Sequence, residues 1–514
     1  MRQLRTIAGL RAYRQQQSPN QTIGLVPTMG ALHPGHFSLI RAARQANDGV
    51  VVSIFVNPLQ FGPGEDLDAY PQTLAQDLQH CAELGVDLVF TPSPAEMGRA
   101  HAHTQATGQT TSVVPPRSLT QGLCGASRPG HFTGVATIVT QLLNLVQPSR
   151  AYFGQKDAQQ VVVLRRLVAD LGLPVEICTC PIARDASGLA YSSRNQYLSA
   201  EQRQQATVLQ RSLAAARTAF LEGERQRDRL LTPVQKALAT EPEVKLDYLE
   251  LVHPETLAPL DKIDDRALLA IAAWVGPSRL LDNVLLQQRQ PTIAIDGPAG
   301  VGKSTVTRQL AQRLGLIYLD TGAMYRAITW QAQQAQVDLE DAIALAELAA
   351  TAHIEFVSRE DHAPQQVLLN GQDVTTAIRS QAVTQQVSTV ARQPAVRQHL
   401  VRLQQAWGQK GGIIAEGRDI GTVVFPEAEV KIFLTASAQE RARRRWQELD
   451  PEVQAGLDLE TLTKQIQERD RQDSTRATAP LRKAADAIEI MTDALTIEQV
   501  MAQIEAQYHQ VLNS

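Results

Sequence analysis

Two glycine-containing loops carry residue types that bind nucleotide phosphates. The first is PTMGALHPGH, residues 27–36, in which His33 and His36 stand three residues apart. If a helix begins near Pro34, both imidazoles lie on one side of its first turn. The exposed amides of a helix start favour a triphosphate, and the glycines let the backbone approach it. Two histidines there can donate hydrogen bonds to phosphate oxygens and stabilise the charge of a departing pyrophosphate; the alternative is ordinary packing of two loop histidines.

The second loop is GPAGVGKS, residues 297–304, which fits the phosphate-binding pattern GxxxxGK[ST]. It stands between an expected strand at 292–296 and an expected helix, as the pattern requires. Backbone amides of such a loop wrap the phosphates, Lys303 reaches the β and γ oxygens, and Ser304 can ligate magnesium. By itself the loop predicts only that the chain binds a nucleoside triphosphate.

Further polar segments follow apolar stretches of the first half, at 57–61, 128–134, 153–160 and 191–195. Because ligands gather at the carboxyl edge of a parallel sheet, one shared site explains these segments better than several independent loops. In the second half, ERDRQDSTR at 468–476 alternates arginines with acids and hydroxyls, as a nucleotide clamp requires. The arginine run at 441–445 fits a solvated helix face equally well.

An α/β scaffold must position the loops of the first half. Its expected strands alternate with helical windows, as in an open parallel sheet, and lie at 23–28, 50–56, 88–91, 151–153 and 175–180. After residue 194, one long amphipathic helix at 200–223 and short strands at 244–252 and 268–275 predict a smaller α+β subdomain.

The second half repeats the α/β alternation with different loop chemistry. Strands at 354–357 and 367–370 predict an antiparallel hairpin inserted into it. The polar stretch at 286–291 ends in proline and is the expected boundary between the halves. We therefore expect units at 1–285, divided into a body 1–195 and a subdomain 196–285, and at 290–514.

Composition narrows the function classes. Of 514 residues, 43% are hydrophobic and 20% charged, and 49 basic against 53 acidic side chains give a net charge of −4. No global basic field therefore attracts nucleic acid or an anionic membrane. The four cysteines form no CxxC pair, and the longest strongly apolar run, 267–276, is far below the roughly 20 residues of a membrane span. We expect a soluble cytoplasmic protein without nucleic-acid or membrane partners.

The first half resembles the pantothenate synthetase (pantoate–β-alanine ligase) family of the HxGH nucleotidyltransferases. The resemblance covers about residues 1–285 and rests on PTMGALHPGH, FVNPLQF, FGQKDAQQ and SSRNQYLS. It implies a Rossmann-like fold in which pantoate and ATP give pantoyl adenylate and pyrophosphate, after which β-alanine displaces AMP. Tyr191 departs from the family, which more often has leucine or methionine there, and the change bears on adenine packing.

The resemblance also implies site residues. His36 is the family's proton donor, and His33 and Lys156 are expected to act with it. Gln60 and Gln160 would hold pantoate, with Gln60 also near β-alanine. Asn57 and Arg128 would line the same site. The expected ligase ATP residues are Met29, Gly30, Ala31, Leu32, His33, Pro34, Gly35, His36, Gly154, Gln155, Lys156, Asp157, Ala183, Tyr191, Ser192, Ser193 and Arg194.

The second half, about 290–514, resembles cytidylate kinase, a P-loop nucleoside monophosphate kinase. IAIDGPAGVGKST, LDTGAMYR, NGQDVT, EGRDIGTVVFPEA and KIFLTA carry the resemblance. It implies transfer of the γ-phosphoryl group of ATP to CMP or dCMP with Mg²⁺. The expected kinase ATP residues are Gly297, Gly300, Gly302, Lys303, Ser304 and Thr305, with Ser304 on the metal. The expected monophosphate residues are Thr321, Tyr325, Arg326, Ser388, Arg397, Arg418, Arg469, Asp473 and Arg476.

Within these sets, Lys303 and Arg418 are the expected catalytic residues of the kinase. Ser388, Arg397 and Asp473 offer hydrogen-bond partners to the cytosine amine and ring nitrogen. Arginines of a lid that includes 448–458 would neutralise the transferring phosphoryl group. A homodimer through the first half is also expected from the resemblance.

Other functions fit parts of these patterns. The first half alone is consistent with a nucleotidylyltransferase that forms a dinucleotide, although paired glutamines argue against it. The second half alone is consistent with a small-metabolite kinase. A purely nucleotide-binding or assembly role requires a lost key residue, and His33, His36, Lys156, Lys303 and Arg418 are all present.

Overall fold

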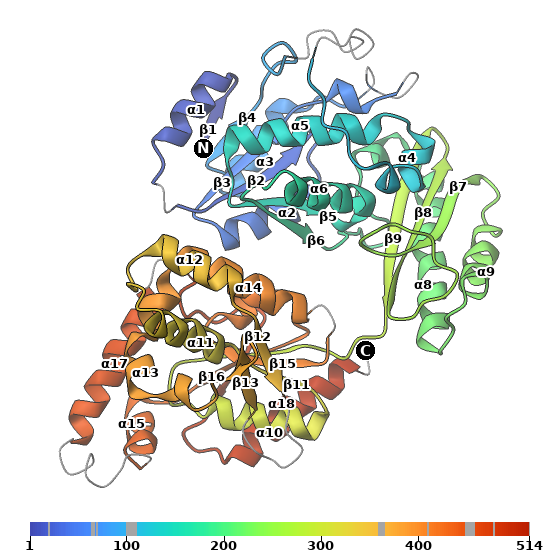
Figure 1. Ribbon diagram of the computed structural model, residues 1–514. Coiled ribbons are helices and arrows are strands. Elements are labelled where there is room, and N and C mark those ends of the chain that lie inside the picture. Colours follow the sequence, from blue (N-terminus) through green and yellow to red (C-terminus); the bar gives the residue numbers. More distant parts are fainter. Residues whose placement is uncertain are drawn as a thin grey trace. The chain divides into compact units, whose positions relative to one another are not determined.

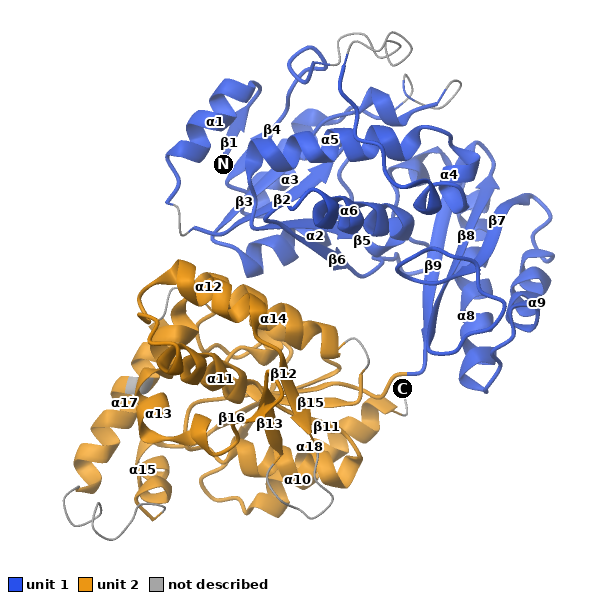
Figure 2. Ribbon diagram, in the orientation of Figure 1, with its two compact units in different colours: residues 1–288 blue, residues 289–514 orange. Residues whose placement is uncertain are grey.

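The chain forms two compact units, residues 1–288 and 289–514 (Figure 2). The computed structural model describes residues 1–18, 21–62, 67, 70–98, 110–357, 365–408, 411–447, 458–475 and 479–512. Both units are α/β, and each has its own parallel sheet (Figure 1).

The body of the first unit is built on a six-stranded parallel sheet of order β1-β4-β3-β2-β5-β6. Its strands are β1 (Arg2–Leu4), β2 (Ile23–Thr28), β3 (Gly49–Ile54), β4 (Leu88–Phe90), β5 (Arg150–Gly154) and β6 (Glu176–Cys180). The five strands expected from the sequence are therefore present with bounds shifted by at most two residues, and β1 is an addition at the edge.

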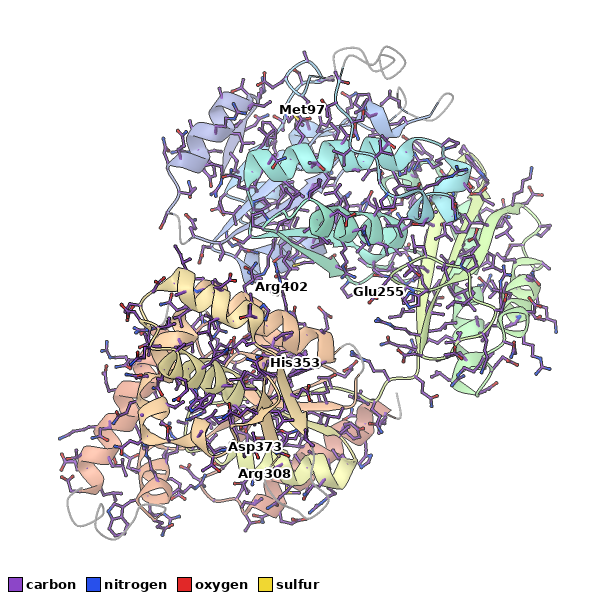
Figure 3. The ribbon with its side chains drawn as sticks, viewed as in Figure 1. Met97, Glu255, Arg308, His353, Asp373 and Arg402 are labelled. Carbon is purple, nitrogen blue, oxygen red and sulfur yellow. The ribbon has the colours of Figure 1, made fainter. Side chains whose placement is uncertain are left out.

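Helices cover both faces of this sheet because its inner strands are apolar on alternate sides. Leu25 and Val51 pack with Met97 and with α5 on one face, and Met97 is 1% exposed (Figure 3). Val26 and Val52 pack with α2 and α3 on the other face. The helices are α1 (Ile7–Gln15), α2 (Pro34–Ala46), α3 (Leu74–Glu83), α4 (Leu123–Ser127), α5 (His131–Val146) and α6 (Ala158–Asp170).

The small subdomain combines an antiparallel sheet of order β7-β8-β9 with three helices. The elements are α7 (Ala200–Ala206), α8 (Val208–Leu221), α9 (Arg227–Leu238), β7 (Val244–Val252), β8 (Arg266–Val275) and β9 (Ser278–Gln287). The prediction of one long helix over 200–223 is wrong. Thr207 interrupts it, and its hydroxyl donates to the Gln204 carbonyl at 2.7 Å, which competes with regular helical bonding. Strand β9 was not predicted.

The second unit has a five-stranded parallel sheet of order β11-β15-β10-β16-β17. Its strands are β10 (Ile293–Asp296), β11 (Ile317–Asp320), β15 (Ile413–Gly417), β16 (Val430–Thr435) and β17 (Ile488–Met491). Its helices are α10 (Lys303–Leu314), α11 (Thr321–Gln334), α12 (Ala342–Thr351), α13 (Gln381–Arg392), α14 (Pro394–Gly408), α15 (Ala438–Gln447), α17 (Leu459–Thr475) and α18 (Ile497–Leu512).

The predicted hairpin of the second unit is confirmed. Strands β12 (Ile354–Val357) and β13 (Gln366–Leu369) pair antiparallel, and β14 (Gln372–Asp373) extends them into a three-stranded sheet. Among the described residues, no helix combines the length and apolar character that crossing a membrane requires.

Candidate active sites

The HxGH loop joins β2 to α2, and its histidines meet as their spacing predicts. His33 is the N-cap of α2, and Pro34 occupies the first turn. The rings of His33 and His36 stack with centroids 4.0 Å apart, and the Tyr191 ring lies 6.2 Å from His33. Two imidazoles are thus presented side by side at the start of a helix, where backbone amides favour an anion.

Both histidines are held neutral. Burial and the Lys156 ammonium lower the pKa of His33 to about 4. Burial, His33 and Lys156 lower the pKa of His36 well below its ordinary value. Their Nδ1 atoms are buried and have no hydrogen-bond partner among the described residues. A neutral imidazole still carries one N–H donor, so the pair can bind phosphate oxygens without its own charge.

A carboxylate that the sequence analysis missed holds this loop. Asp77, on α3 and 1% exposed, accepts the backbone amide of Ala31 at 3.1 Å and that of Leu32 at 2.8 Å. Gly30 and Ala31 have φ of +86° and +50°, so the loop makes a left-handed turn at this point. The Asp77 bonds fix that turn because two acceptor oxygens meet two consecutive amide donors.

Gln60 lies at the centre of a second group of expected residues, after β3. Its Nε2 is 2.6 Å from the Met29 sulfur, and Asn57 Nδ2 donates to its Oε1 at 3.2 Å. Arg128 donates to the Gln60 carbonyl at 3.2 Å, and His131 Nδ1 lies 2.8 Å from that oxygen. Segments far apart in the sequence therefore converge on one residue, as the shared-site interpretation predicts.

Arg128 also lines a pocket that it shares with Lys156, Asp157 and Gln160. Tyr248 of the small subdomain lines the same pocket. The neighbouring Gln159 has a different role, because its amide donates to the Leu119 and Gly122 carbonyls at 2.9 and 3.0 Å and is buried. Both adjacent glutamines line this pocket, but the amide of Gln159 is already engaged by two backbone carbonyls.

The remaining residues expected to bind ATP in the ligase follow β5 and β6. Gly154 ends β5, and the Gln155–Asp157 turn precedes α6. The Tyr191 amide donates to the Ala183 carbonyl at 3.0 Å. The Ser192 hydroxyl accepts the Arg194 amide at 3.3 Å, and the Ser193 hydroxyl is 3.1 Å from the Tyr70 hydroxyl.

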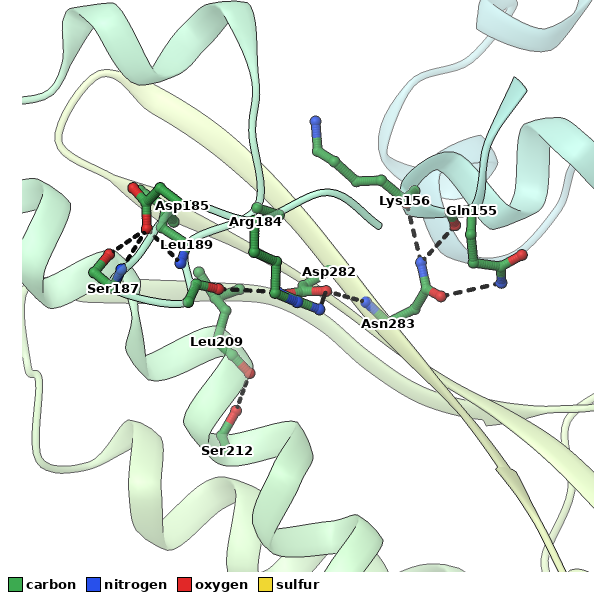
Figure 4. Close-up of polar contacts among 12 residues, drawn as sticks. Gln155, Lys156, Arg184, Asp185, Ser187, Leu189, Leu209, Ser212, Asp282 and Asn283 are labelled. Carbon is green, nitrogen blue, oxygen red and sulfur yellow. Dashed lines mark hydrogen bonds and ion pairs between the residues drawn. The ribbon is translucent and has the colours of Figure 1, made fainter. Parts of the chain in front are cut away.

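Strand β9 of the small subdomain contacts these segments, which the sequence analysis did not foresee. Asn283 bonds the backbone of Gln155 and Lys156, and Asp282 forms a bidentate ion pair with Arg184 (Figure 4). The Ser278 hydroxyl donates to the Arg194 carbonyl at 3.2 Å.

In the second unit, the glycine loop between β10 and α10 has the geometry of a phosphate cradle. Gly297, Gly300 and Gly302 have φ of +150°, +80° and +88°. A Cβ at Gly297 would stand 2.1 Å from the Leu434 carbonyl oxygen. The Lys303 ammonium donates to the Gly297 and Pro298 carbonyls at 2.7 and 2.6 Å. Burial and Arg418 lower the pKa of Lys303.

Oxygen-bearing side chains gather beside this loop. The Ser304 hydroxyl donates to the Glu416 carboxylate at 2.9 Å, and the Tyr318 hydroxyl bonds the other carboxylate oxygen. Thr321 donates to the Glu416 carbonyl at 2.8 Å. Asp296, at the end of β10, accepts the Ile420 and Gly421 amides, both at 2.7 Å. Thr305 lies exposed on α10.

The arginines of the expected monophosphate site whose side chains are described are held by acids, aromatics or hydroxyls. Arg418 donates to Asp473 at 2.8 Å. Arg397, 6% exposed, pairs with Asp419 and lies 5.5 Å over the Tyr325 ring.

Arg326, on α11, has a hydrogen-bond partner on α13. It donates to the Thr384 hydroxyl at 2.8 Å. Ser388 is exposed on α13, one turn after Thr384 and therefore on the same face. Of Arg469 only the backbone, in α17, is described, and Arg476 and the lid residues 448–457 lie outside the described residues.

The charges of Arg418 and Asp473 reach the lysine of the phosphate loop. Both charges act on Lys303, and Arg418 and Arg379 act on Arg326, whose pKa burial lowers. Two of the expected monophosphate residues, Arg326 and Arg418, therefore interact electrostatically, and Arg418 also acts on Lys303.

The environment of Arg441 decides whether the arginine run at 441–445 is only a solvated helix face. Its guanidinium is 5% exposed and forms a bidentate pair with Asp470, at 2.9 and 2.5 Å. It also donates to the Ala299 carbonyl of the phosphate loop at 3.2 Å. Arg443, by contrast, is exposed and pairs with Glu440 on its own helix. Within the run, Arg441 thus makes a buried contact, whereas Arg443 belongs to a solvated helix face.

These two units define an enzyme of the nucleotide-binding α/β class, with an HxGH nucleotidyltransferase-type site and a P-loop kinase site. The family models agree: pantoate–β-alanine ligase matches residues 2–285, and cytidylate kinase matches residues 293–510. The chain belongs to the bifunctional pantoate ligase/cytidylate kinase family.

Similar proteins match nearly the whole chain. The bifunctional pantoate ligase/cytidylate kinase of Nostoc sp. is 56% identical over 100% of both chains. That of Thermosynechococcus vestitus is 57% identical over 98% of this chain and 97% of its own. The crystal structure of pantothenate synthetase from Thermus thermophilus is 47% identical, with a TM-score of 0.52, over 56% of this chain and all of that one.

The comparisons confirm the predicted family, fold class and pair of activities. The protein is an ATP-using pantoate–β-alanine ligase and an ATP-using nucleoside monophosphate kinase. The alternative activities considered for each half, dinucleotide formation and phosphorylation of a small metabolite, are set aside.

Proposed function

We propose that the first unit activates pantoate at the HxGH site. The pantoate carboxylate attacks the α-phosphorus of ATP, forming the acyl–adenylate bond and releasing pyrophosphate. The β-alanine amine then forms the amide bond and displaces AMP. His33 and His36 donate N–H bonds to the phosphates, while Lys156 supplies positive charge that the neutral histidines lack.

The other ligase ATP residues and the glutamines complete this assignment. The loop at 29–36 and the segments at 154–157, 183 and 191–194 hold ATP. Gln60 and Gln160 hold pantoate, and Asn57 and Arg128 line the site. The observation that carries the proposal is the stacking of the His33 and His36 rings at the start of a helix. The Lys156 charge acts on both rings, which supports one site for the loop at 29–36 and the turn at 155–157.

We propose that the second unit transfers the γ-phosphoryl group of ATP to CMP or dCMP. The acceptor phosphate oxygen forms the new P–O bond, and ADP leaves. Gly297, Gly300, Gly302, Lys303, Ser304 and Thr305 hold ATP, and the monophosphate residues hold the acceptor. The Arg418 charge, which lowers the pKa of Lys303, supports this arrangement, since the transferring group needs several cations.

We also propose that Mg²⁺ acts in the kinase site. The Ser304 hydroxyl and the Glu416 carboxylate it contacts are oxygen donors beside the phosphate loop, which suits this cation. Bound there, Mg²⁺ would neutralise charge on the β- and γ-phosphates. Ser304 is the residue that would hold it.

Paired variants of the whole chain test both assignments. Lys303→Ala should abolish CMP phosphorylation and leave pantothenate formation unchanged, and His36→Ala should do the reverse. Each activity serves as the folding control for the other variant. If either variant, with its fold intact by circular dichroism, loses both activities, the two sites are not independent.

Assembly and location complete the proposal. We propose a homodimer formed through the ligase unit, which the family resemblance supports and sedimentation of the full chain would test. We place the enzyme in the cytoplasm. The free thiols of Cys81, Cys124 and Cys178 support a reducing compartment.

A further inference from the structure

Strand β9 of the small subdomain reaches three separate segments that carry ligase ATP residues. Ser278, at its start, bonds the Arg194 carbonyl at 3.2 Å. Asp282, in its middle, pairs with Arg184, next to Ala183. Asn283 bonds the turn that contains Lys156. Three loops of the body are thus attached to one strand.

The Asn283 contact determines where the Lys156 turn lies. Its Nδ2 donates to the Gln155 carbonyl at 2.9 Å and to the Lys156 carbonyl at 3.0 Å, and its Oδ1 accepts from Gln155 Nε2 at 3.2 Å. The Asn283 side chain therefore uses both its donor and its acceptor groups on two residues. The Lys156 side chain extends away from these bonds (Figure 4).

The Asp282 contact acts in the same way on the Ala183 segment. Its carboxylate takes two bonds from Arg184, at 2.6 and 2.8 Å, and both Asp282 and Asn283 are 4% exposed. Arg184 also donates to the Gly188 carbonyl at 3.1 Å, and Ala183 accepts the Tyr191 amide. The ion pair therefore fixes Arg184, which in turn bonds Gly188, and the Tyr191–Ala183 bond joins the two ends of the 183–191 segment.

We propose that Asn283 and Asp282 are positioning residues for the formation of pantoyl adenylate. They act through Lys156 and the Ala183–Tyr191 segment, so the inference rests on the ATP-site roles proposed above. β9 suits this role because it is hydrogen-bonded to β8 along its whole length, whereas the segments it contacts are turns. Misplacement of a catalytic group by about 1 Å can cost a factor of about 100 in rate.

The first test replaces the donor of Asn283. Asn283→Asp keeps an acceptor for Gln155 but puts negative charge against two carbonyls. In single-turnover measurements on the full chain, we expect the rate constant for pyrophosphate release to fall about 10- to 100-fold. Attack of β-alanine on supplied pantoyl adenylate should fall much less, because no triphosphate is then present. Asp282→Asn, which keeps the side-chain shape, should slow the same step.

Two readouts separate positioning from loss of folded protein. Partial unfolding lowers the amplitude of the turnover and leaves its rate constant unchanged, whereas misplacement lowers the rate constant. CMP phosphorylation by the same chain should keep its wild-type value. Glu255→Gln, at a residue labelled in Figure 3, is the matched control. The Glu255–Arg266 pair belongs to the same subdomain and bonds none of the described segments expected to hold ATP.

A double-mutant comparison identifies the residue through which Asn283 acts. If Asn283 works through Lys156, Asn283→Asp should slow the Lys156→Ala variant little further. Full additivity of the two effects, or a wild-type rate constant in both Asn283→Asp and Asp282→Asn, would overturn the inference. A wild-type rate in Lys156→Ala would overturn the proposed role of Lys156, and this inference with it; a slow Lys156→Ala beside unchanged β9 variants would overturn the inference alone.

Discussion

Replacing Asp77 by asparagine removes one of the two acceptors that hold the HxGH loop. The native carboxylate accepts the Ala31 and Leu32 amides at 3.1 and 2.8 Å and is contacted by the Thr73 hydroxyl at 3.3 Å. The asparagine amide keeps one backbone bond, but its NH₂ group faces the second backbone N–H. One charge-assisted bond is lost and one amide is left unpaired in a buried place, which costs about 2–4 kcal/mol.

This cost should appear as lost catalysis, because the bonds hold the turn at Gly30 and Ala31 that shapes the phosphate-binding loop. If the whole cost is felt in the transition state, kcat/KM for ATP in pantothenate formation falls about 30- to 900-fold. Steady-state assays with varied ATP measure it. Urea unfolding of the same variant measures the part of the cost that appears as lost stability.

Asp87→Asn provides the matched control. Asp87 accepts the Val50 amide at 2.7 Å and pairs with Arg44 at 2.7 Å, at the amino edge of the same sheet. It should lower the free energy of unfolding and leave the KM for ATP unchanged. Equal losses of ligase activity in Asp77→Asn and Asp87→Asn, or an Asp77→Asn enzyme that is destabilised but has wild-type kcat/KM, would refute the reasoning.

Three further predictions concern pH and the phosphate loop. Burial lowers the pKa of His33 from 6.5 to about 4. Above pH 6.5 the imidazole is neutral in the folded and unfolded states, and as pH falls from 6.5 to 4 the unfolded state takes up a proton that the folded state does not. Urea unfolding should therefore show a loss of about 3 kcal/mol over that range, absent from His33→Gln. Phosphates bound at Lys303 should raise its lowered pKa, so ATP binding should be accompanied by proton uptake. Calorimetry of ATP binding to the His36→Ala variant, in buffers of different ionisation enthalpy, measures this uptake. Adding Lys303→Met should abolish it. Gly297→Ala should abolish kinase activity because its Cβ would meet the Leu434 carbonyl at 2.1 Å, whereas Gly315→Ala, with φ of +66° and open space, should cost only about 1 kcal/mol of stability.

The sequence predicted those strands, the hairpin and the histidine pair that depend on interactions between residues close together in the chain. The strands of the first sheet appear because short apolar runs between helical windows have few other ways to be buried. The stacking of His33 and His36 follows from their spacing once a helix begins at Pro34. The hairpin at 354–357 and 366–369 follows in the same way from two apolar runs of matching length.

Long-range pairings could not be predicted. Asp77 stands 46 residues from Ala31, and Asn283 stands 127 residues from Lys156, so no periodicity links either pair. Arg441 lies in a run of arginines whose pattern is typical of a solvated face, and only its burial against Asp470 distinguishes it from Arg443. The break at Thr207 depends on the bond from one hydroxyl to a backbone carbonyl, which an amphipathic pattern does not record.

In both sites a buried carboxylate accepts the backbone amides of two consecutive residues, although the loops are unrelated in sequence. In the first unit Asp77 accepts the amides of consecutive residues, and in the second Asp296 accepts those of Ile420 and Gly421. A carboxylate matches two adjacent N–H donors, and its charge strengthens both bonds. In Asp296 this arrangement is costly: burial raises its pKa from 3.8 to about 6, so its ionised form destabilises the folded unit by about 3 kcal/mol at neutral pH. That cost is full above pH 6 and vanishes below pH 3.8, where the acid is protonated in both states. Stability alone does not explain why a charge is kept here at this cost. Ionised Asp296 instead holds the segment that follows Arg418 in a fixed place, through its bonds to the Ile420 and Gly421 amides.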